Sequence, residues 1–488
     1  MKILVIGLDS AAPEILFGDE RLGNFRRLME GGCYGRLETI IPPITVPAWM
    51  CMATSQDPGS LGVYGFRNRA DHSYDGLAIA NARSIRELAI WDQVAREGKR
   101  ANVIAVPPGF PPRKVNGISV GCFLTPDPAK DDYTHPPAVK ATIAELIGDY
   151  AVDVKGFRTH RKDWLKDEIY AMSRKHFDVI RHFLQHSAWD YFQFVEIGLD
   201  RLQHGFWKFH DPDHLLHEAG NPYEDVIRDY YVYLDDELGR ILDTLDDETA
   251  ILVLSDHGSQ RLDGGFCVNE WLVREGLLGL ERYPEQVTPF GGLAVDWPRT
   301  TAWSEGGYYA RVFLNVRGRE PQGTIEPADY ERVRDELKAR FEALTDDHGR
   351  PMRTLVFKPQ EIYRNVRNVA PDLIVHFGEL YWRSIGGVGY PALHVQENDT
   401  GPDDCNHAQH GSFILAAPGS PVRGEVSGTH ILQMAPTLLE LGGYDVPPTM
   451  QGTSLLAGRA LGAVERPAVD AEGEAIIRER LSGLGYIS

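Results

Sequence analysis

Three short apolar segments, each followed within three residues by an aspartate, constrain the fold of this chain more than any other feature. The segments are residues 3–6, 191–197 and 251–254, and the aspartates are Asp9, Asp200 and Asp256. Continuous apolar runs of this length are typical of strands that are buried on both faces. The pattern therefore predicts three interior strands, each of which delivers a carboxylate at its carboxyl end.

Helical patterns lie between these segments. One apolar stripe at helical spacing runs from Leu165 to Phe183, and a second runs from Val226 to Leu245. Strands that alternate with helices predict an α/β fold with a mostly parallel central sheet flanked by helices. Ligands of such sheets bind beyond the carboxyl ends of the strands, so we expect the three aspartates to lie close together.

The alternation weakens after Gly258. Residues 259–369 mix glycine, proline and aromatic residues around one clear helix with Tyr330 and Leu344 on its apolar side. We interpret this stretch as an accessory or lid segment. Core patterning returns with strands at 373–377 and 413–417 and a helix at 431–441. The expected organisation is a discontinuous core of residues 1–258 and 370–460, an accessory segment of 259–369 and a polar tail of 461–488.

The charge and the cysteine content limit the kinds of partner and the cellular location expected for the chain. The chain has 50 basic and 70 acidic residues, a net charge of −20, and it lacks a run of Lys or Arg that would bind a polyanion, so no nucleic-acid polymer is expected. Five scattered cysteines without a CxxC pair favour reduced thiols. No stretch approaches the roughly 20 apolar residues of a membrane span. The expectation is a soluble, cytoplasmic protein of unspecified oligomeric state.

Two spacings suggest metal ligands. Asp200 and His204 are four residues apart and share one face of a helix, although such pairs also occur on solvated helix faces. Asp256 and His257 directly follow a strand and reach one ion only if the chain turns there, which Gly258 would allow; a turn without a metal is the alternative. Both pairs combine oxygen and nitrogen donors.

Two histidines and a threonine lie next to a predicted strand and a predicted helix and could belong to the same site. His407 and His410 precede an apolar strand, and either imidazole could complete a metal site or simply lie on the surface. Thr45 lies near a helix start marked by Pro47, where its hydroxyl either caps the helix or faces an anion. Beside a metal ion the same hydroxyl would become a nucleophile.

Together these residues form two ligand sets. Asp200, His204 and a later histidine would hold one divalent ion, and Asp9, Thr45, Asp256 and His257 would hold another. Mixed nitrogen and oxygen ligation suits zinc best, and manganese is also compatible. Two such ions outweigh the charge of three aspartates, so the site would attract a phosphate ester in spite of the acidic chain.

At this point the sequence resembles the alkaline phosphatase superfamily, in particular its type I phosphodiesterase/nucleotide pyrophosphatase branch. The blocks that carry the resemblance, in order, are GLD at 7–9, PPITVPAW at 42–49, GLDRLQHGFW at 198–207, LSDHG at 254–258, LNVRGREPQG at 314–323, HAQHGSFILAAPG at 407–419 and APTLLELGGYDVPPTMQG at 435–452. The resemblance implies an alkaline-phosphatase-like core, a two-metal phosphodiesterase or phosphohydrolase, attack by Thr45 and a phosphothreonine intermediate. It also implies His407, rather than His410, as the remaining ligand.

The chain departs from the family pattern at Leu61, where a histidine is common, and it lacks the Cys-x-Pro-x-Arg motif of the related sulfatases. Arg67, Asn68 and Arg69 are candidates for contacting the rest of a small phosphate substrate, with solvated surface as the alternative for at least one of them. A phosphomutase of the same superfamily and a catalytically inactive metal-binding protein remain alternatives. The sequence does not choose between diester and monoester substrates.

Overall fold

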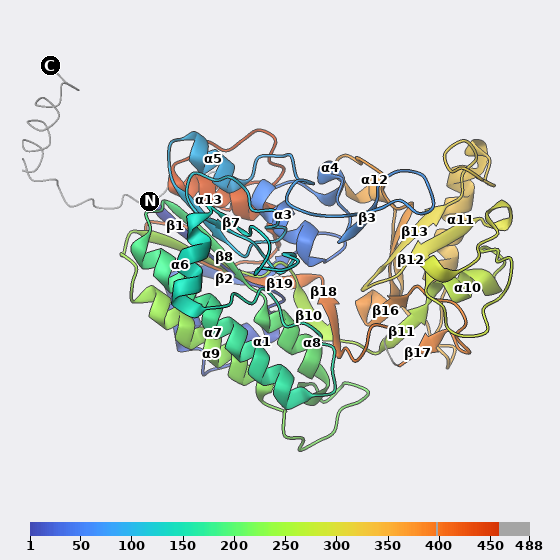
Figure 1. Cartoon of the computed structure of the whole chain (residues 1–488), viewed down its shortest axis with the longest axis horizontal. Helices are drawn as coiled ribbons and strands as arrows, with labels where there is room; N and C mark the ends of the chain where they lie inside the picture. Colours follow the sequence, from blue (N-terminus) through green and yellow to red (C-terminus); the bar gives the residue numbers. More distant parts are fainter. Residues whose placement is uncertain (397–398, 458–488) are drawn as a thin grey trace, which may run out of the picture.

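The computed structural model describes residues 1–396 and 399–457 and shows two bodies side by side (Figure 1). The larger body surrounds a ten-stranded sheet, and the smaller one is built from strands and helices between residues 264 and 395. The polar tail expected at 461–488 lies outside the described residues. The α/β class expected from the sequence is confirmed.

The central sheet contains the three strands that the sequence placed at its centre. Its order is β20 (Gly424–Glu425), β2 (Cys33–Glu38), β19 (His410–Ala416), β9 (Thr249–Leu254), β1 (Lys2–Leu8), β8 (Tyr191–Glu196), β5 (Ala101–Ile104), β6 (Ser119–Val120) and β7 (Thr134–His135), with β21 (Thr429–His430) also paired to β2. Strands β9, β1, β8, β5 and β6 are parallel, whereas β19 runs antiparallel to β9. The start of β19 therefore lies at the edge where β1, β8 and β9 end.

Helices cover both faces of this sheet. One face carries α1 (Pro13–Gly18), α2 (Gly23–Gly31), α7 (Lys162–His186), α8 (Gly198–His210) and α9 (Val226–Leu242), with α6 (Ala138–Ile147) packed on α7. The other face carries α3 (Thr45–Thr54), α5 (Ile90–Arg96) and α13 (Met434–Gly442), which follows a 3-10 turn at Ile431–Gln433. The two apolar stripes expected from the sequence are the buried faces of α7 and α9.

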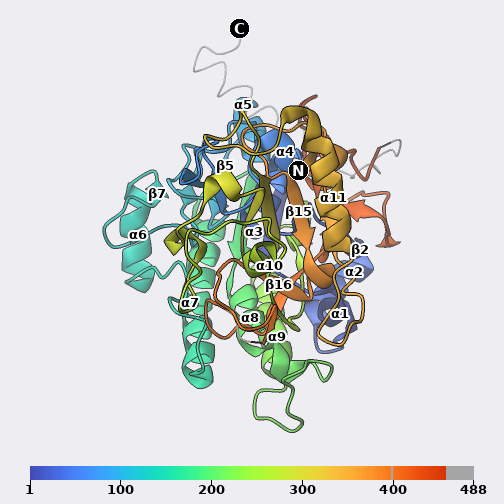
Figure 2. The same ribbon diagram turned by 90° about the vertical axis from the view of Figure 1, so that its right-hand side faces the viewer.

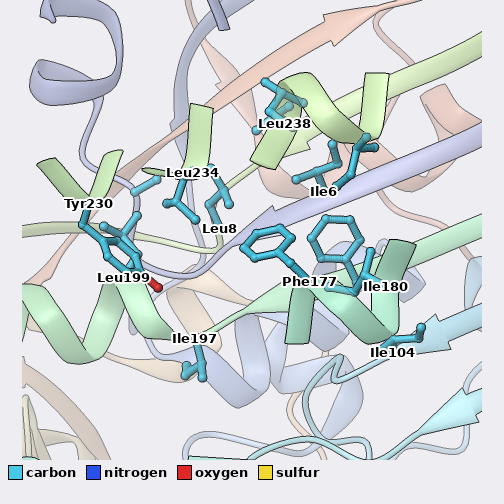
Figure 3. Close-up of a cluster of buried hydrophobic side chains, with 14 of the residues drawn as sticks. Ile6, Leu8, Ile104, Phe177, Ile180, Ile197, Leu199, Tyr230, Leu234 and Leu238 are labelled. Atoms are coloured by element: carbon cyan, nitrogen blue, oxygen red, sulfur yellow. The ribbon is translucent and has the colours of Figure 1, made fainter. Parts of the chain in front are cut away.

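Alternation along β1 divides the core into two layers. Leu4, Ile6 and Leu8 face α7 and α9, whereas Ile3 and Val5 face α3 and α13. Figure 3 shows Ile6 and Leu8 among apolar side chains of α7 and α9. Because both faces of the strand are buried, its direction and register are fixed, and the residue that follows it has a defined position.

The smaller body, which faces the viewer in Figure 2, has a hydrophobic core of its own. Its antiparallel sheet has the order β12 (Ala302–Glu305), β13 (Ala310–Leu314), β15 (Leu373–His376) and β14 (Leu355–Phe357). A second sheet has the order β16 (Trp382–Ile385), β11 (Gly264–Cys267) and β17 (His394–Val395), and the helices are α10 (Val268–Arg274) and α11 (Tyr330–Glu342).

One expected boundary differs from the structure. The apolar pattern of residues 373–377 predicts a buried strand and a return of the chain to the core at residue 370. This strand, β15, instead lies between β13 and β14 of the smaller body. Leu373 and Val375 on one face pack in the core of that body, whereas Ile374 on the other face packs in a separate cluster with Ile44 and Tyr64. We therefore propose that the accessory segment runs from residue 259 to about residue 404, where β18 (Cys405–Ala408) begins.

Two short two-stranded sheets lie outside the sheets described so far. Strand β10 (Gly258–Arg261) pairs with β18, and β3 (Arg67–Arg69) pairs with β4 (Leu77–Ile79) after the short helix α4 (Pro58–Leu61). A further short helix, α12 (Pro359–Ile362), follows β14. Among the helices described here, not one combines the length and the apolar character needed to cross a membrane.

Candidate metal centre

Three buried aspartates meet at the carboxyl ends of the central strands, where α3, α8, β10 and β18 come together (Figure 1). Asp9 directly follows β1, Asp256 lies in the turn between β9 and β10, and Asp200 lies in the first turn of α8, which follows β8. The sequence placed each carboxylate at a strand end, and the parallel order of the strands brings the three together.

Each aspartate has one oxygen held by the protein and one without a hydrogen-bond partner. The held oxygens accept from Trp49 Nε1 at 2.9 Å (Asp9 Oδ2), from the Ser10 backbone N–H at 3.2 Å (Asp256 Oδ1) and from Arg201 Nη1 at 2.5 Å (Asp200 Oδ2). The unpartnered, buried oxygens are Asp9 Oδ1, Asp256 Oδ2 and Asp200 Oδ1. Burying an unpaired carboxylate oxygen is costly, so this arrangement suits a cation.

Three buried histidines complement these oxygens. Each imidazole points its Nδ1 at an acceptor: His257 at the carbonyl of Gly258 (3.0 Å), His407 at the carbonyl of Pro43 (2.8 Å) and His204 at Asp403 Oδ1 (2.6 Å). Because Nδ1 donates its hydrogen, Nε2 carries the lone pair in a neutral ring. Anchoring one nitrogen in this way is the usual support of a metal-ligating histidine.

The free nitrogens face the free oxygens. His257 Nε2 lies 3.2 Å from Asp256 Oδ2 and 3.8 Å from Asp9 Oδ1. Asp200 Oδ1 lies 3.3 Å from His204 Nε2 and 3.9 Å from His407 Nε2. Ligand atoms about 2 Å from a shared tetrahedral ion are separated by roughly 3.3 Å, so the residues present fit divalent metal ions.

Donor atoms within 4.8 Å of one another form two overlapping groups at this edge, one of Asp9, Asp256 and His257 and one of Asp200, His257 and His407. His257 belongs to both groups, and its ring stacks on that of His407 with centroids 3.7 Å apart. Of the two histidines left open by the sequence, His407 is buried in this cluster, whereas His410 is exposed.

Thr45 is the first residue of α3, with Ile44 in the N-cap position, and all ten residues of this helix are buried. Its Oγ1 lies 3.3 Å from His257 Nε2. The expectation of a residue at or beside the N-cap is therefore met, and the hydroxyl faces the carboxylates from the positive end of the helix.

Glycine makes room for two close approaches near these groups. A Cβ on Gly7 would lie 2.5 Å from Trp49 Cη2, so a glycine in β1 lets the indole reach Asp9. A Cβ on Gly258 would lie 2.1 Å from the carbonyl oxygen of His410. The chain turns at Asp256 and His257, as expected, but Gly258 does so without a positive φ and is needed for close strand packing.

Burial, repulsion between carboxylates and attraction to cationic side chains set the pKa values of these groups. Burial and the charge of Asp200 raise the pKa of Asp9, and burial and the charge of Asp9 raise the pKa of Asp256. The pKa of Asp200 is lowered, because attraction to His204 and Arg201 outweighs burial. Burial lowers the pKa of His257 to about 4, so its ring is neutral at pH 7 and Nε2 can offer its lone pair to a metal ion.

The sequence did not indicate five residues around the site, and one of them, Arg201, holds Asp200. Trp49 and Ser10 hold aspartates, and their spacing from Thr45 and Asp9 is the only signal that could have suggested them. Asp403 and Tyr308 come from distant parts of the chain. The Tyr308 ring lies 4.4 Å from that of His407 and 5.2 Å from that of His204, a contact that no sequence spacing indicates.

The three substrate candidates have different surroundings. Arg69 is buried, with Nη1 3.2 Å from Glu320 Oε1, and Asn68 bonds to the backbone of Tyr64 and Gly65. Their polar groups therefore serve the fold. Only Arg67 has a largely exposed side chain (53%), which lies 3.7 Å from Glu305 at the edge of a hollow of about 840 Å³.

Solved structures share this fold at low sequence identity. Murine ectonucleotide pyrophosphatase/phosphodiesterase 5 matches with a TM-score of 0.53 and 14% identity over 95% of this chain and 100% of that chain. The same figures hold for its inactive threonine-to-alanine form in complex with AMP. Phosphonoacetate hydrolase from Sinorhizobium meliloti, in complex with phosphonoformate, matches with a TM-score of 0.59 and 15% identity over 90% of this chain and 95% of that chain.

A family model of type I phosphodiesterases and nucleotide pyrophosphatases also matches the chain, which places it among the phosphoester hydrolases. Sequence comparison with curated proteins gives no match. The chain belongs to the type I phosphodiesterase/nucleotide pyrophosphatase family, whose model matches residues 3–412.

Proposed function

We propose that this protein is a metal-dependent phosphodiesterase that cleaves small phosphate esters through a phosphothreonine at residue 45. The observation that carries the proposal is the pairing of three unpartnered, buried carboxylate oxygens with three inward-facing imidazole nitrogens beside Thr45 Oγ1. A site that buries so much unneutralised charge is expected to be completed by cations.

We assign the ligands in two sets, as the family resemblance implies. Asp9, Thr45, Asp256 and His257 would hold one ion, and Asp200, His204 and His407 would hold the other. Zinc suits these donors, with manganese as the alternative. Such ions would lower the pKa of the Thr45 hydroxyl and neutralise charge on the transferred phosphoryl group.

The residues of the chain then have defined tasks. The Thr45 hydroxyl gives up its proton to solvent, and Oγ1 forms a bond to phosphorus while the bond from phosphorus to the leaving oxygen breaks. The leaving alkoxide takes a proton from solvent and departs as the alcohol. Water next cleaves the Thr45 ester, which restores the hydroxyl and releases the phosphate product. Trp49 and Arg201 hold Asp9 and Asp200 in place throughout. Arg67 is the residue of the three candidates that we retain for substrate contact.

The substrate is expected to be a small phosphate or phosphonate ester. A structural neighbour binds AMP, and its form in this complex, which lacks one threonine, is inactive. Another neighbour hydrolyses a phosphonate. We also propose a cytoplasmic location, because five scattered cysteines without a CxxC pair are too few for a disulfide scaffold.

The test combines metal analysis with turnover of bis-p-nitrophenyl phosphate and p-nitrophenyl phosphate by the wild type and Thr45→Ala. The wild type should bind two divalent ions per chain, prefer the diester, and carry phosphate on Thr45 after an acid quench. Thr45→Ala should bind ions and lose turnover. A Thr45→Ala protein with full turnover would exclude the nucleophile, and transfer of phosphate to a second hydroxyl of a monoester would indicate a mutase instead.

A further inference from the structure

Asp403 is the acceptor for the outer nitrogen of His204, with Nδ1 and Oδ1 only 2.6 Å apart. This carboxylate lies in the segment before β18, far in sequence from α8, and it is fully buried. The Asp404 backbone N–H also donates to the His204 carbonyl at 2.9 Å, which fixes the segment against the helix. The orientation of His204 is therefore set from outside its own helix.

His204 Nδ1, Asp403 and Cys405 are close enough to suggest a further metal site, but the contact distances argue against one. An ion held by both Nδ1 and Oδ1 would separate them by roughly 3.3 Å, more than the distance found. The cluster is a hydrogen-bonded support for the imidazole.

Residues from both bodies converge on the other oxygen of Asp403. Arg158 Nε, from the loop before α7, donates to Oδ2 at 2.9 Å. Arg383 Nη1 in β16 donates to it at 3.3 Å, and the Tyr308 hydroxyl lies 3.4 Å away. The same Tyr308 hydroxyl is 3.4 Å from His204 Nε2. Arg383 and Tyr308 belong to the accessory segment, so Asp403 links that segment to a ligand of the core.

We propose that Asp403 is a positioning residue that holds His204 toward Asp200, and that Arg383 and Tyr308 couple docking of the accessory body to metal affinity at this position. The inference rests on the proposed function, since it assigns a support to one of its ligands. Carboxylates that bind the outer nitrogen of a ligating histidine fix the ring orientation, and their loss typically costs 10- to 100-fold in metal affinity.

The neighbouring residue Asp404 provides a matched control. It is also buried and also forms ion pairs, to Lys162 Nζ at 3.7 Å and Lys208 Nζ at 3.5 Å, but it bonds to His204 through its backbone and not through its carboxylate. Asp403→Asn and Asp404→Asn therefore remove the same charge one residue apart. Only the first changes the acceptor of the imidazole.

The experiment measures zinc affinity by competition with a chelator and the visible spectrum of the cobalt-substituted full chain. Asp403→Asn should weaken one of the two ions about 10- to 100-fold, leave the other unchanged and alter the cobalt spectrum. Asp404→Asn should change zinc affinity by less than about threefold and keep the wild-type spectrum. Equal effects of the two variants, or equal weakening of both ions, would overturn the proposal.

Arg383→Gln tests the coupling even if Asp403→Asn does not fold. It should weaken the same ion by a smaller factor than Asp403→Asn, whereas the exposed control Arg299→Gln should have no effect. Wild-type affinity in Arg383→Gln would refute the coupling. If the wild type itself binds no ions or leaves bis-p-nitrophenyl phosphate intact, the proposed function fails. If the wild type binds ions and hydrolyses the diester, but the Asp403 and Asp404 variants have equal zinc affinity, only this inference fails.

Discussion

The indole of Trp49 in α3 donates a hydrogen bond to Asp9 Oδ2 at 2.9 Å and thereby leaves Asp9 Oδ1 for a cation. Trp49 lies one helical turn after Thr45, so a single helix presents the hydroxyl and fixes one of the carboxylates. The contact links the packing of α3 to the geometry of the site.

Trp49→Phe should reduce metal affinity as well as stability. The substitution leaves Asp9 Oδ2 buried without a donor, which costs about 1–3 kcal/mol in the free energy of unfolding. With both oxygens of Asp9 unheld, we expect metal affinity to fall about tenfold or more. Urea unfolding and chelator competition measure the two effects, and unchanged metal affinity in the folded variant would contradict this role.

Gly7→Ala should destabilise the protein through the same contact. The new methyl group would lie 2.5 Å from Trp49 Cη2 and 2.9 Å from the carbonyl oxygen of Phe194, and neither strand nor indole can yield easily. Overpacking of this kind costs about 1–3 kcal/mol. Gly18→Ala, where nothing lies within 4 Å of the added carbon, is the control. Equal unfolding free energies of the two variants would refute the packing argument.

Part of the fold and of the site could be predicted from the sequence. The strands that end near Asp9, Asp200 and Asp256 could be predicted, because buried parallel strands are continuous apolar runs and their carboxyl ends share one edge. The antiparallel direction of β19, which brings His407 to that edge, has no such signal. Strand β15 was assigned to the wrong body, because an apolar run does not specify which sheet buries it.

Asp256→Asn should stabilise the metal-free protein and remove most of its stabilisation by metal. Burial and the charge of Asp9 raise the pKa of Asp256, so the ionised carboxylate is unfavourable when no cation is bound. Relief of this repulsion is expected to be on the order of 1–2 kcal/mol. For the wild type, zinc at 100 times its dissociation constant should add about 2.7 kcal/mol for each of the two ions.

Unfolding in urea with chelator and with excess zinc gives both quantities for the Asp256→Asn variant. A variant that is less stable than the wild type in chelator, or that gains as much as the wild type from zinc, would argue against a shared cation at Asp256.

Arg67 and Arg69 should respond differently to substitution. Arg69→Gln removes a buried partner of Glu320, although Arg319 remains beside that carboxylate, so we expect a loss of about 2 kcal/mol or more in stability. Arg67→Gln should leave stability within about 0.5 kcal/mol and raise KM for the diester. Steady-state kinetics with urea unfolding distinguishes the two, and a raised KM for Arg69→Gln without destabilisation would reverse the assignment.

Stability should depend on pH through His376 in β15, which is remote in sequence from the proposed ligands. Burial lowers its pKa from 6.5 to about 3, and its Nε2 has no hydrogen-bond partner. The unfolded chain takes up a proton near pH 6.5 whereas the folded protein does not, so the free energy of unfolding falls as the pH drops toward 3. This group contributes up to about 1.4 kcal/mol for each pH unit.

His376→Phe should therefore have a shallower dependence than the wild type between pH 6 and pH 4, measured by urea unfolding in chelator. Parallel curves for the two proteins would mean that His376 is protonated in the folded state.

The most direct test of the two-ion site is an anomalous difference map from crystals grown with zinc and measured at the zinc edge. We predict two peaks, one within ligand distance of Asp9 Oδ1, Asp256 Oδ2 and His257 Nε2, and one next to Asp200 Oδ1, His204 Nε2 and His407 Nε2. Crystals grown with saturating zinc that show no peaks at these atoms, or that show zinc only elsewhere, would contradict the account.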